Sequence, residues 1–138
     1  MTVLALLTAG VLVLVGALHV LWTFSPWPLR TREEFARLVV DVPPEKLPSA
    51  GLTLAVAVLL GVAAYLVVGR AGLVGVPGPA WLTVVGTAGV AAVFLLRGAG
   101  GLAVSSRKST EFARLDLRVY SPLCLALATS CAVIAFGG

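Results

Sequence analysis

Four long stretches of the sequence contain no charged residue. Lys, Arg, Asp and Glu are absent from residues 1–29, 47–69, 71–96 and 119–138. Each stretch is long enough for a helix of about 20 residues, the length that crosses a hydrocarbon core about 30 Å thick. Only 12% of the 138 residues are charged, against about 25% in soluble domains. These absences exclude an ordinary soluble domain, because a small globule cannot bury so much apolar surface.

The sequence also lacks the motifs of the commoner soluble chemistries. It contains no P-loop, no Rossmann glycine motif, no haem CxxCH and no serine nucleophile elbow. Its single histidine and two cysteines do not have metal-ligand spacing. Its basic residues are interleaved with acids and belong to no recognised nucleic-acid-binding module. We therefore expect no metal, no cofactor and no nucleic-acid partner.

What remains predicts an all-α integral membrane bundle of four transmembrane helices in a single domain over residues 1–138. The predicted spans are residues 2–24, 49–68, 80–97 and 120–137. The first is expected to be a retained helix, since it lacks the basic start and the short apolar run of a signal peptide. All six acidic residues are then expected to lie in the loops.

The basic residues are distributed unevenly over the connections between these spans. Nine of the ten lie in or beside the first and third connections, and Arg70 alone lies in the second. Because short cytoplasmic loops are enriched in Lys and Arg, both charged loops are predicted in the cytoplasm and both termini outside. The chain is thus expected to be a multi-pass membrane protein in contact with membrane lipids.

A five-residue segment occurs twice. Glu34–Leu38 and Glu111–Leu115 both read EFARL, and each lies between one span and the next. The repeat indicates either a tandem duplication of a two-helix unit, with both halves in the same orientation, or chance in a biased composition. In the first copy, Thr31 is a predicted helix N-cap.

Two residues near the ends of predicted spans are candidates for a site. His19 lies three residues before Trp22, so the two share a helix face. A histidine inside a span is a packing residue, a proton carrier or a ligand contact. Arg97 is followed by Gly98-Ala99-Gly100-Gly101. It either extends to the membrane surface or binds a phosphate or carboxylate together with flexible backbone amides.

The densest polar stretch precedes the fourth span. Glu111 and Arg114 share one helical stripe, and Asp116 and Tyr120 share another. This segment is either a solvated interfacial helix with weak salt bridges or one wall of a polar pocket. Arg97, His19 and Trp22 are expected at the same membrane level as this segment. The more specific hypothesis is therefore a polar pocket that all of them share.

Several of these motifs together resemble a bacterial family of small four-helix membrane proteins, catalogued as a domain of unknown function. The motifs are His19-x-x-Trp22, Trp27-Pro28, Arg97-Gly98, TEFARLD at 110–116 and YSPLC at 120–124. The resemblance covers nearly the whole chain. It implies a bacterial inner-membrane protein and brings no established activity.

The first functional hypothesis is binding or acid–base transformation of an amphipathic lipid or isoprenoid, for example by a cyclase or isomerase. The candidates are Glu111, Asp116 and His19 as catalytic residues, and Trp22, Trp27, Arg97, Arg114 and Tyr120 as substrate-binding residues. One alternative is a small oligomeric transporter or channel that associates through Gly86, Gly89 and Ala92. Another is an accessory subunit of a larger membrane partner.

Overall fold

The computed structural model describes residues 1–25, 27, 29–40, 42, 45, 47 and 49–137. Its elements are α1 (Thr2–Phe24), α2 (Arg32–Phe35), the π-helix η1 (Ala36–Val40), α3 (Ala50–Arg70), α4 (Trp81–Ser105), α5 (Glu111–Leu115), the π-helix η3 (Asp116–Tyr120) and α6 (Ser121–Gly137). Within the described residues, four segments are long and apolar enough to cross a membrane, namely α1, α3, α4 and the stretch Glu111–Gly137. The predicted all-α, four-span architecture is therefore confirmed, and no strand occurs among the described residues.

Hydroxyl side chains begin three of the helices. The Oγ1 of Thr31 accepts a hydrogen bond from the backbone N–H of Glu34 at 3.1 Å, which confirms the predicted N-cap. Ser49 caps α3 in the same way, and Thr110 caps α5. Such caps satisfy backbone N–H groups that have no partner inside the helix. Each charged connection therefore ends in a defined helix start.

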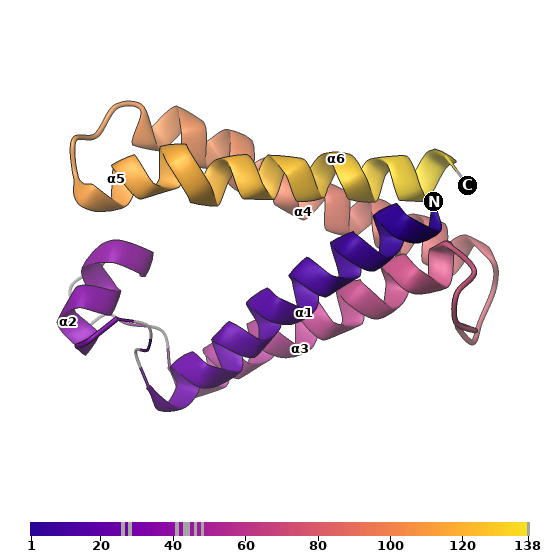
Figure 1. The fold of residues 1–138 in the computed structure, drawn as a ribbon, viewed down its shortest axis with the longest axis horizontal. Coiled ribbons are helices and arrows are strands. Elements are labelled where there is room, and N and C mark those ends of the chain that lie inside the picture. Colours follow the sequence, from indigo (N-terminus) through magenta and orange to yellow (C-terminus); the bar gives the residue numbers. More distant parts are fainter. Residues whose placement is uncertain are drawn as a thin grey trace.

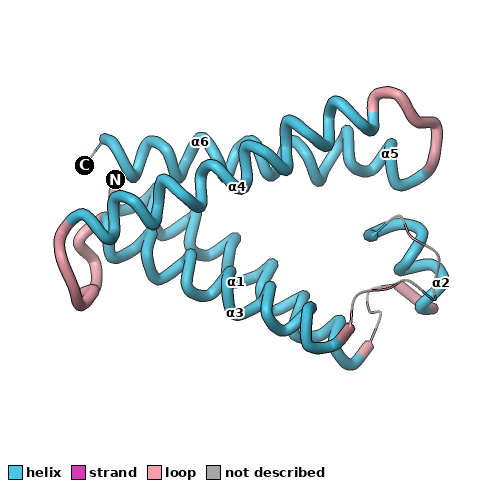
Figure 2. Tube along the Cα trace, turned by 180° about the vertical axis from the view of Figure 1, so that it is seen from behind, coloured by secondary structure: helices cyan, strands magenta, loops and turns pink. Residues whose placement is uncertain are grey.

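The four long helices form two hairpins. α1 packs along α3, and α4 packs along α6. Figures 1 and 2 show that the hairpins meet near the two chain termini and diverge toward the opposite end, where α2 and α5 lie. The molecule is thus a wedge that is closed at the end carrying the termini.

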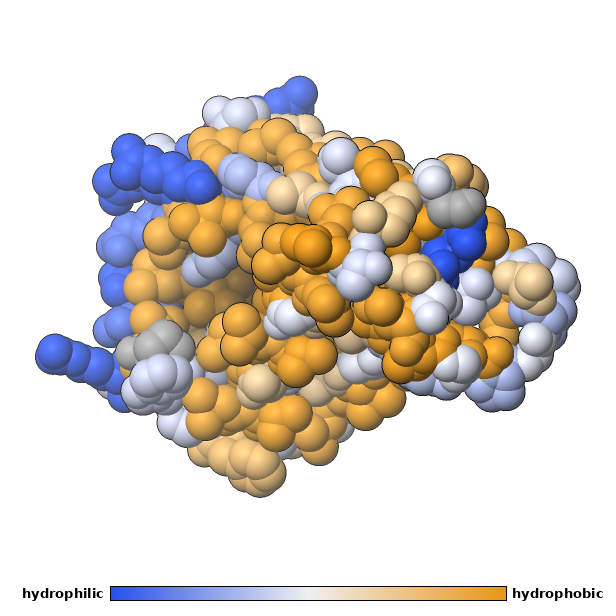
Figure 3. Space-filling view, turned by 45° about the vertical axis from the view of Figure 1, so that its right-hand side comes forward, coloured by the Kyte–Doolittle hydropathy of each residue, from blue (hydrophilic) through white to orange (hydrophobic). Residues whose placement is uncertain are grey.

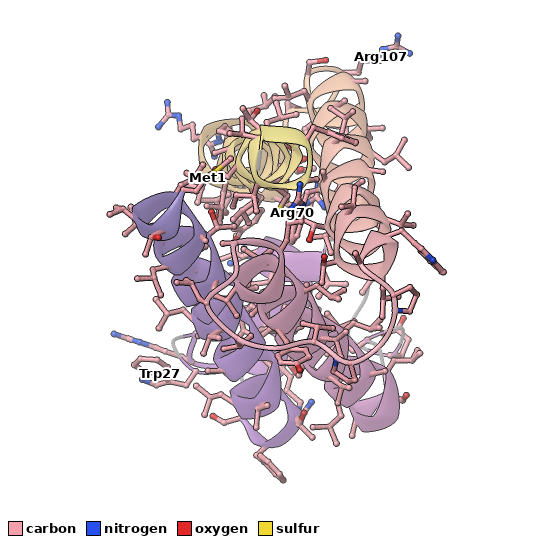
Figure 4. The ribbon with its side chains drawn as sticks, turned by 90° about the vertical axis from the view of Figure 1, so that its right-hand side faces the viewer. Met1, Trp27, Arg70 and Arg107 are labelled. Carbon is pink, nitrogen blue, oxygen red and sulfur yellow. The ribbon has the colours of Figure 1, made fainter. Side chains whose placement is uncertain are left out.

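Small side chains close the narrow end of this wedge. Its core includes Ala5, Ala9, Ala63, Ala64 and Ala91, all of which are buried. Small residues let helix backbones approach closely, which is the usual basis of helix packing in lipid. Arg70, labelled in Figure 4, adds a polar tie, because its Nε donates to the backbone oxygen of Ala135 at 3.0 Å. This bond satisfies a carbonyl in the last turn of α6.

Two glycines on α4 also serve packing within the chain. A Cβ atom on Gly98 would lie 2.7 Å from Cγ of Leu125 and 3.1 Å from its backbone nitrogen, so α4 and α6 touch there. A Cβ on Gly86 would lie 2.8 Å from Leu66 on α3. Gly89 faces open space, with nothing within 4 Å of such a Cβ. Part of the small-residue surface that suggested oligomerisation is therefore used inside the molecule.

Both charged connections lie at the wide end of the wedge. Hydrophilic side chains gather at that end in Figure 3, whereas most of the remaining visible surface is apolar. Apolar side chains on the outside of a four-span bundle are expected in a bilayer, where lipid tails cover them. The chain is therefore a multi-pass membrane protein, and the cytoplasmic placement of its charged end remains a prediction.

This orientation can be tested by cysteine labelling in a chain whose Cys124 and Cys131 are replaced by serine. Arg107→Cys lies at the charged end, and Gly75→Cys lies in the opposite connection. We expect a membrane-impermeant maleimide to label Gly75→Cys in intact bacterial cells, and Arg107→Cys only after the cells are opened. The reverse pattern would show that the positive-inside rule fails for this chain.

A pair of alanine substitutions tests the close contact between α4 and α6. Gly98→Ala and Gly89→Ala both gain helix propensity, up to about 1 kcal/mol. Only Gly98→Ala introduces a clash, so we expect it to be about 1–3 kcal/mol less stable than Gly89→Ala. Thermal unfolding in detergent measures the difference. Equal stabilities would mean that the two helices do not touch at Gly98.

Candidate functional site

A cavity of about 900 Å³ lies between the diverging hairpins. Its walls are mainly apolar and include Leu52, Val56 and Leu59 of α3 and Leu96 and Val104 of α4. The short helix α2 and its π-helical continuation contribute side chains at the charged end. Figure 3 shows a hollow between apolar side chains close to that end. The cavity is therefore an apolar space with one polar end.

The polar end is built around the carboxylate of Asp116, which is only 1% exposed. Its Oδ1 accepts hydrogen bonds from Ser121 Oγ at 2.8 Å and from Arg97 Nη2 at 3.1 Å. Its Oδ2 accepts one from Ser105 Oγ at 2.5 Å. A buried charge is tolerated only when it is paired and hydrogen-bonded, and these three donors meet that requirement. The expectation that all acids lie in loops is wrong for Asp116.

The backbone at η3 brings two members of this cluster together. The N–H of Ser121 donates to the carbonyl of Asp116, which is an i to i+5 bond of a π-turn. Such turns are rare and frequently occur at functional sites. The same two residues are thus joined by a backbone bond and a side-chain bond, and the carboxylate is aimed at α4.

Residues on α4 complete the cluster because they share one helical face. Arg97, Gly101 and Ser105 are spaced by four. A Cβ on Gly101 would collide with Ser121 Oγ and the Arg97 guanidinium, and it would lie 2.9 Å from Asp116 Oδ2. Glycine at this position leaves the space that the ion pair occupies. Gly98–Gly101 lies inside α4, so the predicted contribution of flexible backbone amides to an anion site is wrong.

Arg97 is the member of the cluster that remains accessible. Its side chain is 42% exposed, although it forms an ion pair with the buried Asp116. A guanidinium carries five N–H donors, and the bond to Asp116 uses one of them. The ion pair therefore fixes the guanidinium in place and leaves other donors at the cavity surface.

Aromatic side chains of the first hairpin lie on the cavity wall opposite α4. His19, Trp22 and Phe35 all line the cavity. The ring centroids of His19 and Trp22 are 4.9 Å apart, and those of Trp22 and Phe35 are 5.0 Å apart. Nδ1 of His19 lies 2.8 Å from the carbonyl of Val15. Since a carbonyl only accepts, Nδ1 must carry the proton, which leaves Nε2 as the acceptor in the neutral ring.

The structure brings together four of the eight residues singled out from the sequence. His19, Trp22, Arg97 and Asp116 line the cavity. Tyr120 lines a smaller adjoining pocket of about 220 Å³ and donates its hydroxyl to the backbone oxygen of Leu38 at 3.1 Å.

The other three candidates do not line the described cavity. Glu111 forms a half-exposed ion pair with Arg37 at 3.6 Å. Arg114 is exposed. Trp27 is 61% exposed, lies at the edge of the molecule in Figure 4, and accepts a hydrogen bond at its backbone oxygen from Trp22. Pro28, its partner in the Trp-Pro motif, lies outside the described residues.

Sequence reasoning missed Ser105 and Ser121, and it placed Gly101 in a flexible anion-binding segment rather than in the packing of the cluster. The spacing of four between Arg97, Gly101 and Ser105 was a usable signal for Gly101 and Ser105. Ser121 offered no such signal, because an α-helical register does not place it over Asp116. Its contribution depends on the π-turn.

The two EFARL segments play parallel parts in the structure. Phe35 and Phe112 both line the cavity, and Ala36 and Ala113 are both fully buried. The first segment overlaps the π-helix η1, which begins at Ala36, and the second ends directly before the π-helix η3. α5 packs against η1 at the wide end of the wedge. The two copies therefore close the same end of the cavity from opposite hairpins, while duplication remains a prediction.

A family model described as "Protein of unknown function (DUF3995)" matches residues 12–131. The chain belongs to this family, which confirms the resemblance to a family of uncharacterised proteins. Searches of curated proteins and of solved structures gave no match.

A pair of neighbouring serines tests whether the cluster stabilises the wide end of the wedge. Ser105→Ala removes a buried donor from Asp116, whereas the hydroxyl of Ser106 donates to the carbonyl of Ala103 in the last turn of α4. We expect Ser105→Ala to lower the free energy of unfolding by about 1–3 kcal/mol and Ser106→Ala to change it by less than about 0.5 kcal/mol. Thermal unfolding in detergent provides the comparison. Equal effects would show that Asp116 does not depend on Ser105.

Proposed function

We propose that this member of the DUF3995 family binds an amphipathic lipid or isoprenoid in the cavity between its two hairpins. The apolar part of the ligand lies between α3 and α4, and its polar end meets Arg97. One observation carries this proposal: an apolar cavity of about 900 Å³ ends at a buried ion pair whose arginine is still 42% exposed. The exposed part of this guanidinium is available to the polar end of a ligand, in addition to its bond to Asp116.

The size of the cavity supports a ligand of moderate length. Small-molecule sites are typically clefts of about 300–1,000 Å³ with apolar walls and a few placed polar groups. At about 30 Å³ for each non-hydrogen atom, the value for liquid water, the space holds about 30 such atoms. That number fits an isoprenoid chain or a lipid with one acyl chain.

The exposed parts of the cavity wall support entry from the bilayer. Leu52 and Leu59 of α3 and Leu96 of α4 line the cavity, yet they are 62%, 66% and 74% exposed. In a membrane, these faces of α3 and α4 meet lipid tails. A lipophilic molecule can therefore enter sideways between the hairpins without crossing water.

Binding is better supported than chemical transformation. Three donors occupy the Asp116 carboxylate, which favours a positioning role over that of a general acid. Glu111 does not line the cavity, since it pairs with Arg37 at the surface. Of the three proposed catalytic residues, His19 alone both lines the cavity and has a ring nitrogen that the bond to Val15 does not use. An acid–base function, proposed second, therefore rests on His19.

Two glycines on α4 provide a matched test of ligand binding. Gly100 borders the cavity and Gly89 does not, while a Cβ at either position meets open space. We expect Gly100→Trp to fill the cavity and to reduce at least tenfold the amount of lipophilic molecule that copurifies. Gly89→Trp should retain the wild-type amount. Native mass spectrometry after gentle purification, followed by extraction and identification of the ligand, measures both.

The same experiment also covers the alternative functions. A wild-type protein that carries no ligand, or two variants that retain it equally, would contradict the proposal. If an empty protein purified only as an oligomer or with a second subunit, transport or assembly would become the better explanation.

A further inference from the structure

Resting on that proposed function, we infer that the ligand is an anionic amphiphile, a lipid with a carboxylate or phosphate head group that Arg97 binds. The proposed function requires only that the ligand has a polar end. The charges at the cavity, the geometry of Arg97 and its depth in the molecule indicate that this end is anionic.

The charges that border the cavity favour an anion. Among the described lining residues, the charged ones are Arg32, Arg97 and Asp116. Asp116 is only 1% exposed, and Ser105, Ser121 and Arg97 satisfy its oxygens. A ligand in the cavity therefore meets two guanidinium groups and almost no carboxylate surface. A cationic head group would face these guanidinium groups, and a neutral one would give the remaining N–H donors of Arg97 no charged acceptor.

The ion pair prepares Arg97 for a planar or tetrahedral anion. A guanidinium presents its N–H groups in a rigid fork that matches carboxylate and phosphate oxygens. The bond to Asp116 at 3.1 Å fixes one side of this fork, and 42% of the side chain remains exposed. A group that is already oriented loses less conformational freedom when a ligand binds. Asp116 thus acts as a positioning residue for the ligand-binding Arg97.

The positions of Arg97 and Arg32 suit a lipid whose head group lies near the wide end of the wedge. Arg97 lies two turns before the end of α4 at Ser105, about 12 Å along the helix axis. Arg32 belongs to α2, at the wide end of the wedge. A head group between these two arginines lies near the membrane surface, and its chain then runs toward Leu96 and Leu59. Because the charged connections lie at this end of the molecule, we expect the head groups of the bilayer at the same end, and the ligand then need not change depth on entering.

Trp22 provides a direct reporter, because it lines the cavity whereas Trp27 and Trp81 are each 61% exposed. In the double variant Trp27→Phe/Trp81→Phe, Trp22 is the remaining tryptophan. The protein is placed in bilayers of neutral lipid and titrated with dibrominated stearic acid, ionised at the working pH, or with its methyl ester. Bromine quenches tryptophan fluorescence on contact. The two probes share a chain and differ in the charge of the head group.

We expect the ionised acid to quench Trp22 at about a tenfold lower mole fraction than the ester, since charge-assisted hydrogen bonds are about twice as strong as neutral ones. Arg97→Gln should remove this preference. Arg107→Gln removes the same charge from a side chain that points away from the bundle in Figure 4, and it should retain the preference. A Trp81-only chain, Trp22→Phe/Trp27→Phe, reports quenching by the surrounding bilayer.

The outcomes separate the two proposals. If acid and ester quench Trp22 equally, and more strongly than they quench Trp81, the cavity binds lipid without discriminating the charge of the head group. That result would overturn the inference. If neither probe quenches Trp22 more than Trp81, the proposed function fails as well. The comparison of acid with ester uses an unchanged Arg97, so it remains decisive even if Arg97→Gln does not fold.

Discussion

The wide end of this molecule depends on one buried carboxylate. Burial keeps water away from Asp116, so the protein itself must supply every partner. Those partners come from two helices: Arg97 and Ser105 from α4, and Ser121 from α6. The requirement holds α4 and α6 together where the hairpins have already separated, and it demands a glycine at position 101. It also fixes the guanidinium of Arg97 beside the cavity.

The two hairpins make unequal contributions to the site. The second hairpin contains the ion pair and its serines, whereas the first supplies His19, Trp22 and Phe35. Neither hairpin alone encloses the cavity, because its walls come from both. The closed end of the wedge, with its alanine-rich core and the bond from Arg70 to α6, therefore sets the spacing on which the site depends.

Much of this fold could be predicted from the sequence, because an absence of charge over about 20 residues has few explanations in a chain of this composition. The helix that extends from Arg97 to Ser105 was harder to foresee. A charged residue at the end of an apolar run looks the same whether it lies in a loop or is paired inside the bundle. Arg97 and Asp116 were both identified, but their contact needs the register of α4 against η3, and the π-turn alters that register. Pairwise geometry of this kind is not encoded in spacing along one helix.

The wedge has a consequence for the membrane around it. A body that is wider at one membrane surface than at the other displaces more lipid area from one leaflet, so it fits a curved bilayer better than a flat one. A change in the angle between the hairpins changes this difference in area. By thermodynamic linkage, a molecule that alters the angle and a membrane that is bent must each influence the other's equilibrium. The curvature of the membrane and the occupancy of the space between the hairpins are then both coupled to the angle between the hairpins.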